Sequence, residues 1–394
     1  MPHRLITRQD QLEELCTHIR EAGIVGFDTE FVAEYYYRPR LCLLQFATPD
    51  RLTAIDPFEV DDLSPWWELM TDSETTVVVH GGREEVRFCH QITGQLPQRL
   101  VDVQIVEGLL SRGYPLSYTN LVQRVVGDRL KSHETRTEWR RRPLTSQQVD
   151  YALDDVRHLI RIWECQQEML SEHGRSDWAE VEVARFIEES TSNGNGEPWR
   201  RLSGVHRLSR RALGCIRELF EWRERLAEQQ DRPVRGVLRD DLLVEVAKRQ
   251  PRSRDDVTAI RGMQRRDYAK FAQDLLDCVE RAAALSDKEL PAKSPPRPTV
   301  TQNEVLGKML SIALAQRCAE CGISTTLVGT NADLQELVRW YLSGRKPENA
   351  PRLAEGWRGE VCGDLLGDVL AGKVALRIVD PAADAPLRFE RLDS

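Results

Sequence analysis

The sequence predicts an N-terminal α/β domain with a mixed sheet, followed by two smaller all-α domains. Strand-like runs fill much of the first 105 residues and then alternate with helices, which is typical of a mixed sheet covered by helices. Beyond them, two segments with linker composition separate helical stretches. A chain of 394 residues is long enough for two or three domains, each with its own core.

The elements of the N-terminal domain follow from hydrophobic patterning. Apolar runs bounded by turn residues predict five strands, at 23–31, 40–47, 51–56, 75–82 and 99–105. The turn at Pro49 and Asp50 makes the second and third strands an antiparallel pair. The fourth is rich in β-branched residues and ends in Gly-Gly, as a buried central strand that enters a helix does. Helices are expected over 9–22 and over about 146–166.

Linker composition sets the domain boundaries that we expect. Residues 190–198 read STSNGNGEP, which is typical of a flexible linker, and 293–299 are proline-rich and stiff. The helical stretch between them is basic, with twenty Lys and Arg against fourteen Asp and Glu over 200–281. Further on, 356–359 predict a turn between helices, and the chain from about 380 looks poorly ordered. The expected domains are 1–189, 208–285 and 301–375, with linkers at 190–207 and 286–300 and a tail at 376–394.

Composition excludes several classes of protein. No apolar run approaches the roughly 18 residues that a membrane span requires, and the first residues lack the apolar region of a secretory signal. We therefore expect a cytoplasmic protein with no membrane partner. The nine cysteines are scattered and do not suggest a disulfide framework. Because the net charge is −8, any binding of nucleic acid depends on local basic patches.

Two carboxylates lie close together in the first predicted strand, which contains GFDTEF (26–31). Asp28 and Glu30 point to the same face because side chains alternate along a strand, while Phe27 points to the other. Neighbouring carboxylates repel each other unless something positive lies between them. The pair is either a strand end that frays into solvent or part of a metal site, and the second interpretation needs further carboxylates from elsewhere in the chain.

Two further segments supply candidates. Tyr151 and Asp155 are four residues apart and share one face of a predicted helix. There a carboxylate could hold a metal while a phenol orients or deprotonates a metal-bound water, although an exposed aspartate near an interfacial tyrosine is the other interpretation. In HGGREE (80–85), Glu84 and Glu85 follow the central strand, where ligands bind in open sheets. They could equally be first-turn residues favoured by the helix dipole.

Taken in order, D-T-E-F, H-G-G-R-E-E and Y-x-x-x-D resemble the motifs of the DEDDy 3′→5′ exonucleases, and within them those of the ribonuclease D family. The resemblance covers nearly the whole chain. Family-like stretches of the N-terminal domain are 36–41, 44–45, 131, 136–139, 142–144, 148 and 151–152. Further along, residues 208–285 resemble an HRDC domain, and 322–370, which contain GWRGE, resemble the second HRDC-like domain of the family.

The resemblance implies a ribonuclease H-like (DnaQ-like) exonuclease fold and a catalytic site with two divalent ions, Mg²⁺ or Mn²⁺. Asp28 is expected to bridge the ions, and Glu30 and Asp155 to complete the shell of the inner ion. Glu85 is expected to hold the outer ion mainly through water, and Tyr151 to orient the attacking water. The family has an aspartate where this chain has glutamate, and since Mg²⁺ keeps several waters, the extra methylene is expected to be tolerated.

Three further residues are expected to bind the substrate. The resemblance places Thr29 and Phe31 beside the terminal nucleotide, with the backbone near Thr29 holding its 3′ end and Phe31 packing on the sugar or base. Phe31 could equally serve strand packing. His80 is expected either to shape the pocket or to be a buried structural histidine. The tyrosines at 35–37 could stack on bases or pack within their loop.

The implied function is a 3′→5′ exoribonuclease that trims RNA with a single-stranded 3′ end, with tRNA precursors as the substrate class and a ring-like monomer as the architecture. Basic residues of 208–285 are expected to contact phosphates, while some pair with neighbouring acids. Two alternatives stay open. One is an RNA-binding protein whose nuclease site is impaired by Glu85. The other is a DNA 3′→5′ exonuclease, since HRDC domains also accompany helicases that act on DNA.

Overall fold

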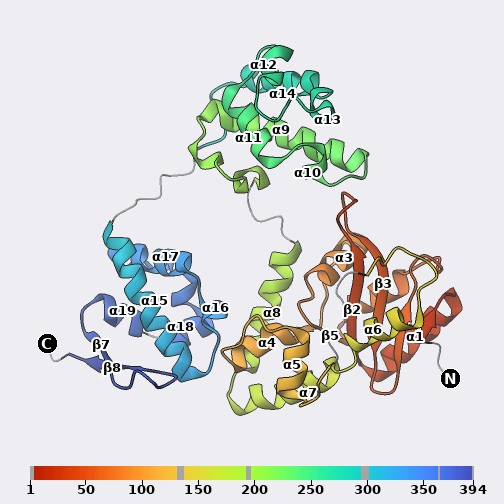
Figure 1. Cartoon of the computed structure of the whole chain (residues 1–394). Coiled ribbons are helices and arrows are strands. Elements are labelled where there is room, and N and C mark those ends of the chain that lie inside the picture. The colour runs from red at the N-terminus through yellow and green to blue at the C-terminus, as the bar shows by residue number, and fades with distance from the viewer. Residues whose placement is uncertain (1–3, 131–136, 192–196, 294–300, 363, 393–394) are drawn as a thin grey trace.

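The computed structural model describes residues 4–130, 137–191, 197–293, 301–362 and 364–392. They form three bodies at the corners of a triangle (Figure 1), which we call the N-terminal domain (up to 191), the middle domain (197–293) and the C-terminal domain (from 301). Residues 192–196 and 294–300, which fall in the two predicted linkers, lie outside the described ranges, and the expected domain boundaries stay predictions. None of the described helices has the length and apolar character needed to cross a membrane.

A six-stranded mixed sheet forms the centre of the N-terminal domain. Its strands are β1 (Leu5–Ile6), β2 (Ile24–Val32), β3 (Arg40–Ala47), β4 (Leu52–Ile55), β5 (Thr76–Val79) and β6 (Leu100–Asp102). Their order is β1-β4-β3-β2-β5-β6, with β2 antiparallel to β3 and parallel to β5. The five predicted strands are present, and β3 and β4 pair antiparallel as expected. β1 escapes prediction because a two-residue strand shows no period of its own.

Helices cover both faces of this sheet. They are α1 (Gln9–Ala22), α2 (Ser64–Met70), α3 (Arg83–Thr93), α4 (Val103–Leu110), α5 (Tyr118–Val125), α6 (Ser146–Asp154), α7 (Leu159–Glu172) and α8 (Ser176–Thr191). On one face Phe27 packs against Trp66 of α2, with ring centroids 4.5 Å apart. On the other face a Cβ atom at Gly26 would lie 3.0 Å from that of Leu159 in α7. Because side chains alternate along β2, Asp28 shares the face of Gly26.

The prediction of one long helix over 146–166 is wrong, because a turn at 155–158 separates α6 from α7. The Tyr118 hydroxyl accepts a hydrogen bond from the backbone N–H of His158 in this turn, at 3.1 Å. The turn also lies against β2, where a Cβ atom at Gly26 would be 3.2 Å from one of its carbonyl oxygens. Packing against distant residues therefore imposes the break on a segment without glycine or proline.

The middle domain is all-α and has a hydrophobic core of its own, in which α9 and α14 pack together. Its elements are the 3₁₀ helices η1 (Pro198–Arg201) and η2 (Val205–Arg207), followed by α9 (Arg210–Gln229), α10 (Val234–Val237), α11 (Asp240–Arg249), α12 (Arg254–Thr258), α13 (Arg266–Ala269) and α14 (Ala272–Ala284). The C-terminal domain consists of α15 (Thr301–Cys321), α16 (Thr325–Val328), α17 (Asn331–Leu342), η3 (Pro347–Asn349), η4 (Arg352–Ala354), α18 (Gly356–Cys362), α19 (Leu365–Leu370), β7 (Val374–Ile378) and β8 (Leu387–Arg391).

Two predictions for the C-terminal domain are wrong. The turn expected at 356–359 is the first part of α18. The chain from 380 is not poorly ordered throughout, because β8 pairs antiparallel with β7 in a hairpin, from Val374 opposite Arg391 to Ile378 opposite Leu387. The two strands, VALRI and LRFER, alternate as strands do. Because the connection between the strands is polar, composition alone did not indicate a hairpin.

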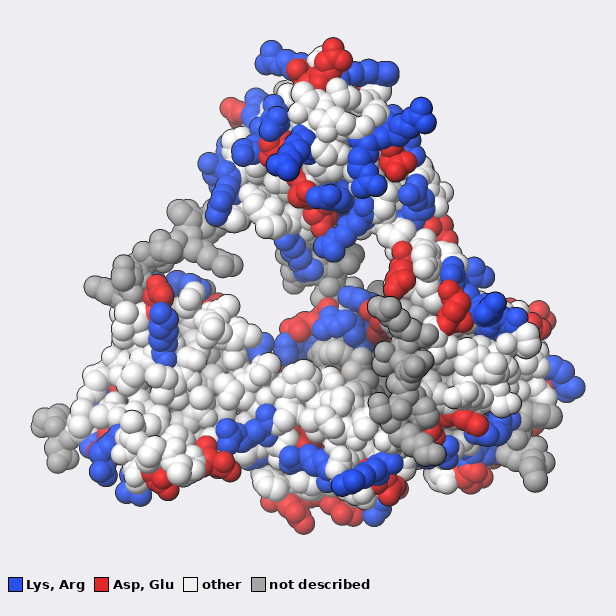
Figure 2. Space-filling model, in the orientation of Figure 1, with Lys and Arg blue, Asp and Glu red and all other residues white. Residues whose placement is uncertain are grey.

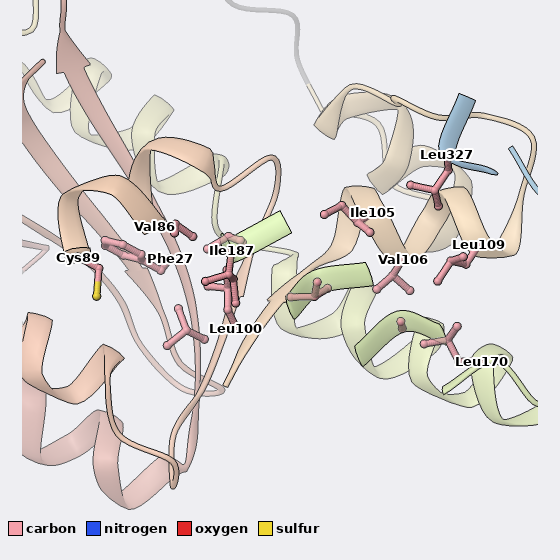
Figure 3. Close-up of a cluster of buried hydrophobic side chains, with 14 of the residues drawn as sticks. Phe27, Val86, Cys89, Leu100, Ile105, Val106, Leu109, Leu170, Ile187 and Leu327 are labelled. Carbon is pink, nitrogen blue, oxygen red and sulfur yellow. The ribbon is translucent and has the colours of Figure 1, made fainter. Parts of the chain in front are cut away.

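The N-terminal and C-terminal domains share one continuous hydrophobic core. Figure 3 shows Leu327 of α16 packed beside α4. Next to this core lies a buried carboxylate, Glu182 of α8. It accepts hydrogen bonds from Nε1 of Trp357 at 3.1 Å and from Nη2 of Arg358 at 2.9 Å. The two domains therefore form a single packed unit.

The N-terminal and middle domains meet through polar contacts and through the Tyr37 ring, which packs against the core of the middle domain. The loop between β2 and β3 reaches α9, where the Tyr37 hydroxyl lies 3.2 Å from a carboxylate oxygen of Glu224, to which it donates. Arg38 pairs with Glu228 at 2.9 Å, and both side chains are more than half exposed. Exposed pairs of this kind contribute about 0–1 kcal/mol. This contact is therefore weaker than the one between the N-terminal and C-terminal domains.

We expect Glu182→Ala to destabilise the joint core strongly, because the Arg358 side chain, 5% exposed, would be left as an unpaired buried charge. The cost of breaking a buried pair in this way is about 3–5 kcal/mol. Glu189→Ala, on the same helix, removes an exposed partner of Arg185 and is the matched control. Scanning calorimetry of both variants checks the prediction, and equal shifts in the unfolding temperature would contradict it.

Candidate active site

Four carboxylates from three parts of the N-terminal domain converge. Asp28 and Glu30 lie on one face of β2, Glu85 is in the first turn of α3, and Asp155 follows the last residue of α6. The pKa of Asp28 is raised well above its usual value, first by burial and then by the charges of the other three carboxylates. Such coupling requires the groups to lie near one another. The structure thus brings together the four predicted carboxylates, whose catalytic role stays a prediction.

Burial and repulsion favour the neutral forms of these groups. Burial, followed by the charges of Asp155 and Glu85, raises the pKa of Glu30 to about 8. Burial also raises the pKa of Asp155 to about 7, with the charge of Asp154 adding to it. The pKa of Glu85 is raised to about 7 by burial, against a hydrogen bond from Thr29 that lowers it. In the described part of the chain, no Lys or Arg is among the causes of these shifts.

The loop that carries Glu85 is fixed by a buried aspartate. Asp102, at the end of β6, accepts hydrogen bonds from the backbone N–H groups of Gly81 at 3.0 Å and Gly82 at 3.1 Å. Gly81 has φ +69°, in the left-handed region that favours glycine, and a Cβ atom at Gly82 would lie 2.4 Å from the side chain of Val79. The two glycines therefore let α3 begin directly after β5, which places Glu85 beside β2.

Thr29 holds the Glu85 side chain. Its hydroxyl donates a hydrogen bond to Oε1 of Glu85 at 2.6 Å, and the two residues are 5% and 4% exposed. The predicted role of Thr29 concerns its backbone near the nucleotide and stays a prediction. Its side chain has a role that sequence analysis did not foresee, which is to orient the carboxylate that departs from the family pattern.

Tyr151 lies beside the carboxylates. Burial raises its pKa to about 12, and the nearby carboxylates, Asp155 first, add to the shift. A phenol with such a pKa keeps its proton at neutral pH and can donate a hydrogen bond, and the role of Tyr151 in the reaction stays a prediction. Its ring stacks on Trp139 with centroids 6.2 Å apart, which fixes the ring plane. The geometry favours an orienting role over deprotonation of water.

Two residues near the site were not singled out from the sequence as site residues. Gln45 of β3 lies opposite Asp28 in the antiparallel register, so their side chains share a face. Gln45 is fully buried, and neither amide atom has a hydrogen-bond partner among the described residues. Burial raises the pKa of Tyr118, and the charges of Asp155 and Asp28 add to it, which places this phenol near the carboxylates. A polar residue inside the apolar run LLQFA was the signal for Gln45.

The donor set fits a divalent cation. Carboxylate and amide oxygens are ligands that Mg²⁺ and Mn²⁺ prefer, and no Lys or Arg of the described ranges is among the causes of the carboxylate pKa shifts. The unsatisfied amide of Gln45 lies on the same face. Among the described residues, no three Asp, Glu, His or Cys side chains are already arranged so that they could hold one ion. An ion shared by three of these side chains therefore requires side-chain rotation, while Thr29 holds one oxygen of Glu85.

The other predicted substrate-binding residues lie on two sides of this region. Phe31 packs edge-to-face on Phe88, with centroids 5.9 Å apart, and lines a cavity of about 1000 Å³ between the N-terminal and middle domains. A ring nitrogen of His80 lies 2.9 Å from the carbonyl oxygen of Leu116, and the ring packs on Tyr118. These contacts fit a structural histidine, and contact of either residue with a nucleotide stays a prediction.

Lys and Arg side chains gather over the visible face of the middle domain (Figure 2). Several of them pair with neighbouring acids, as expected: Arg235 with Asp240 at 2.9 Å and Arg249 with Glu245 at 2.6 Å. The Arg211 guanidinium donates to backbone carbonyls near the end of α14. The charge that remains for phosphates is therefore smaller than composition suggests.

The raised pKa values predict that metal binding depends on pH. A carboxyl group whose pKa is raised on folding contributes stability below its unfolded pKa, near 4, and loses it as pH rises through the folded values of about 7 and 8. A bound cation offsets the stability that is lost as the carboxylates ionise. Protons compete with the cation for the same carboxylates. We expect affinity for Mn²⁺ to be at least about tenfold higher at pH 8 than at pH 6. Titration calorimetry measures it, and equal affinities, or unchanged binding in Asp28→Asn, would contradict the assignment.

Comparisons with known proteins agree with this geometry. Residues 3–171 match a family model described as 3′-5′ exonuclease, and residues 212–279 match the HRDC domain model. Ribonuclease D of Sphingobium indicum is 32% identical over 95% of this chain and 96% of that protein. Ribonuclease D of Gluconacetobacter diazotrophicus is 33% identical over 91% of each chain. The crystal structure of Escherichia coli RNase D, an exoribonuclease involved in structured RNA processing, matches with a TM-score of 0.82 and 28% identity, over 94% of this chain and 99% of that one.

These matches confirm the predicted fold class, an exonuclease domain with a mixed sheet followed by helical HRDC regions. They also confirm the resemblance on which the function was expected. Exonucleases of this family use divalent metal, in agreement with the donor set of the carboxylate site. The chain belongs to the ribonuclease D family, and it is a 3′→5′ exoribonuclease.

Proposed function

We propose that this exoribonuclease releases 5′-monophosphates one at a time from the 3′ end of RNA with the help of two divalent ions, Mg²⁺ or Mn²⁺. The observation that carries the proposal is the convergence of Asp28, Glu30, Glu85 and Asp155 without a compensating cation from the described residues. When bound, the ions activate a water and stabilise the leaving 3′ oxygen during in-line displacement. Asp28 would bridge them, and Glu30 and Asp155 would complete the shell of the inner one.

Tyr151 would orient the attacking water through its retained proton. Its raised pKa, about 12, keeps the phenol neutral across the pH range in which the carboxylates ionise. The stacking contact with Trp139 would hold the hydroxyl in one direction. A carboxylate or solvent would therefore accept the proton of the attacking water, and Tyr151 would only position that water.

Glu85 would replace the family's aspartate without loss of the site. Thr29 fixes one of its oxygens at 2.6 Å, which leaves the other for a water at the outer ion. A ligand that acts through water tolerates one more methylene, because Mg²⁺ keeps several waters in its shell. The alternative of an RNA-binding protein with an impaired site would require Glu85 to fail in this role.

The substrate would be RNA with a single-stranded 3′ end, with tRNA precursors as the class that the family resemblance favours. The relatives with matching full-length chains carry the name ribonuclease D, which supports RNA over DNA. Discrimination between the two requires a contact with the 2′-hydroxyl. We propose that the chain acts in the cytoplasm. We also propose that it acts as a monomer, since one chain supplies three domains arranged as a triangle (Figure 1).

We expect Asp28→Ala to abolish stepwise release of 5′-monophosphates from a 3′-tailed tRNA, with a loss on the order of 10²–10³-fold or more because charge stabilisation is removed. Tyr151→Phe is expected to lower the rate roughly 10²-fold while RNA binding persists. Chromatography of released nucleotides measures both, with a matched DNA as the second substrate. No release by the native chain with either metal, together with retained RNA binding, would favour the RNA-binding alternative.

Substitutions at Glu85 test the departure from the family. Glu85→Asp is expected to keep activity within about threefold, because the outer water contact survives, whereas Glu85→Gln is expected to cost roughly 10–100-fold in rate or metal affinity. Rates at several Mg²⁺ and Mn²⁺ concentrations separate the two effects. If Glu85→Gln matched the native chain at every metal concentration, Glu85 would have no part in holding the outer ion.

A further inference from the structure

A group of arginines and aromatic rings lies on the surface of the N-terminal domain, and it includes two of the tyrosines that could stack on bases. We call it the Arg–Tyr cluster, and its members are Tyr35, Tyr36, Arg40, Phe58, Arg140 and Arg141. The Arg40 guanidinium lies 5.6 Å from the ring centre of Tyr36 and 4.9 Å from that of Phe58. The Arg140 guanidinium lies 4.6 Å from the ring centre of Tyr35. Five of the six members, together with Glu138, line a cavity of about 500 Å³.

The cluster keeps positive charge that its neighbours do not neutralise. Arg140 is paired with Glu138 through two hydrogen bonds, at 2.8 and 2.9 Å. In contrast, neither Arg40 nor Arg141 forms an ion pair with any acid in the described ranges, and Arg40 donates only to the Tyr36 hydroxyl, at 3.4 Å. Both residues are exposed. A local excess of positive charge on a chain of net charge −8 is a feature that attracts an anionic ligand.

The adjacent Arg142 shows what a structural arginine looks like in this segment. It is held by Asp56, at 2.5 and 2.8 Å, and by the carbonyl oxygen of Cys42, at 2.8 Å. Its guanidinium also contacts the Phe58 ring, at 4.4 Å from the ring centre. Arg40 and Arg141 have no such set of acceptors. Their exposure therefore does not follow from a need to hold the fold.

The cluster is built on the same segments as the active site. Trp139, which stacks on Tyr151, directly precedes Arg140. Phe58 packs against the same small core as Tyr151. The tyrosines belong to the loop that follows β2, the strand of Asp28 and Glu30. The cluster therefore lies on segments directly connected to those that carry the carboxylates.

We propose that the Arg–Tyr cluster is a second binding site for single-stranded RNA, which takes nucleotides outside the carboxylate site. An exposed ring, such as Tyr35 at 53% exposure, would stack on a base, and Arg40 and Arg141 would contact phosphates. Aromatic faces combined with unpaired cations are the means by which proteins hold single strands without reading sequence. The proposal rests on the proposed function, because it takes the nuclease substrate as the ligand.

Binding is measured in the Asp28→Asn background, so that no RNA is consumed. The probes are fluorescein-labelled oligoadenylates of two and of twelve nucleotides, with anisotropy as the readout. Tyr36→Leu removes a ring that two arginines contact, and Arg40→Gln removes one unpaired charge. Arg161→Gln, an exposed arginine on α7, is the control for loss of a charge elsewhere on the domain. Circular dichroism verifies that each variant is folded.

The expected result is a loss of dodecamer affinity on the order of tenfold in Tyr36→Leu, with no change for the dinucleotide and none in Arg161→Gln. Arg40→Gln is expected to weaken the salt dependence of dodecamer binding by about 0.7 in the log–log slope. Equal affinities in all variants, or equal losses at both lengths, would overturn the proposal. Nucleotide release by the chain with native Asp28 is assayed separately. Failure of the nuclease assignment would appear in that assay, whereas failure of this proposal would appear as equal effects of the variants on the dodecamer and the dinucleotide.

A fluorescent acidic peptide tests the other kind of partner. If the variants kept their dodecamer affinity and the native chain bound the peptide more tightly than RNA, the cluster would be assigned to a protein partner.

Discussion

The repulsion between four partly buried carboxylates is the constraint on which the rest of this structure depends. Burial raises the pKa of Asp28, Glu30, Glu85 and Asp155, and the charges of the other site carboxylates raise those of Asp28 and Glu30 further. Such a cluster opposes folding of the metal-free chain at neutral pH, so the surrounding framework has to hold it in place. A mixed sheet does so because β2 lies between β5, which pairs with its first part (Ile24–Gly26), and β3, which pairs with the part that carries Asp28 and Glu30. Protonation or a bound cation relieves the repulsion, and at pH values where the carboxylates ionise the need for a cation links the fold to a metal-dependent activity.

The framework works through contacts between parts that are distant in sequence. Asp102 binds the backbone of Gly81 and Gly82 and thereby sets the start of the helix that carries Glu85. Gly26 lets the turn after α6 approach β2, which brings Asp155 to the sheet. In each case a residue without any catalytic role positions a carboxylate. Substitutions at such positions would damage the site without touching a ligand.

Sequence analysis recovers the parts of the site that depend on local periodicity. The alternation of β2 was enough to place Asp28 and Glu30 on one face, and helical spacing paired Tyr151 with Asp155. It misses what depends on packing: the helix break at 155–158, whose cause lies in β2 and α5, and the Thr29–Glu85 hydrogen bond. The β7–β8 hairpin was missed for a different reason, since its polar connection outweighed two short alternating strands in a reading of composition. The family resemblance supplied the roles of the carboxylates, which periodicity alone does not provide.

The three domains are joined with unequal strength. The C-terminal domain shares a core with the N-terminal domain and adds the buried Arg358–Glu182 pair, whereas the middle domain is tied by the partly buried contact of Tyr37 and the exposed ion pair of Arg38. The loop that makes these contacts also carries two rings of the Arg–Tyr cluster. Movement of the middle domain and binding of RNA to the Arg–Tyr cluster would thus both act on the loop that follows β2, the strand of Asp28 and Glu30.

A crystal structure with Mn²⁺ and a nucleoside 5′-monophosphate, read by anomalous scattering, tests the central claim most directly. The account predicts two manganese peaks about 3.5–4 Å apart, with the Asp28 carboxylate between them and Glu85 connected to one of them through water. A single peak, or no peak with the four carboxylates unmoved and Glu85 still bound only to Thr29, would contradict it.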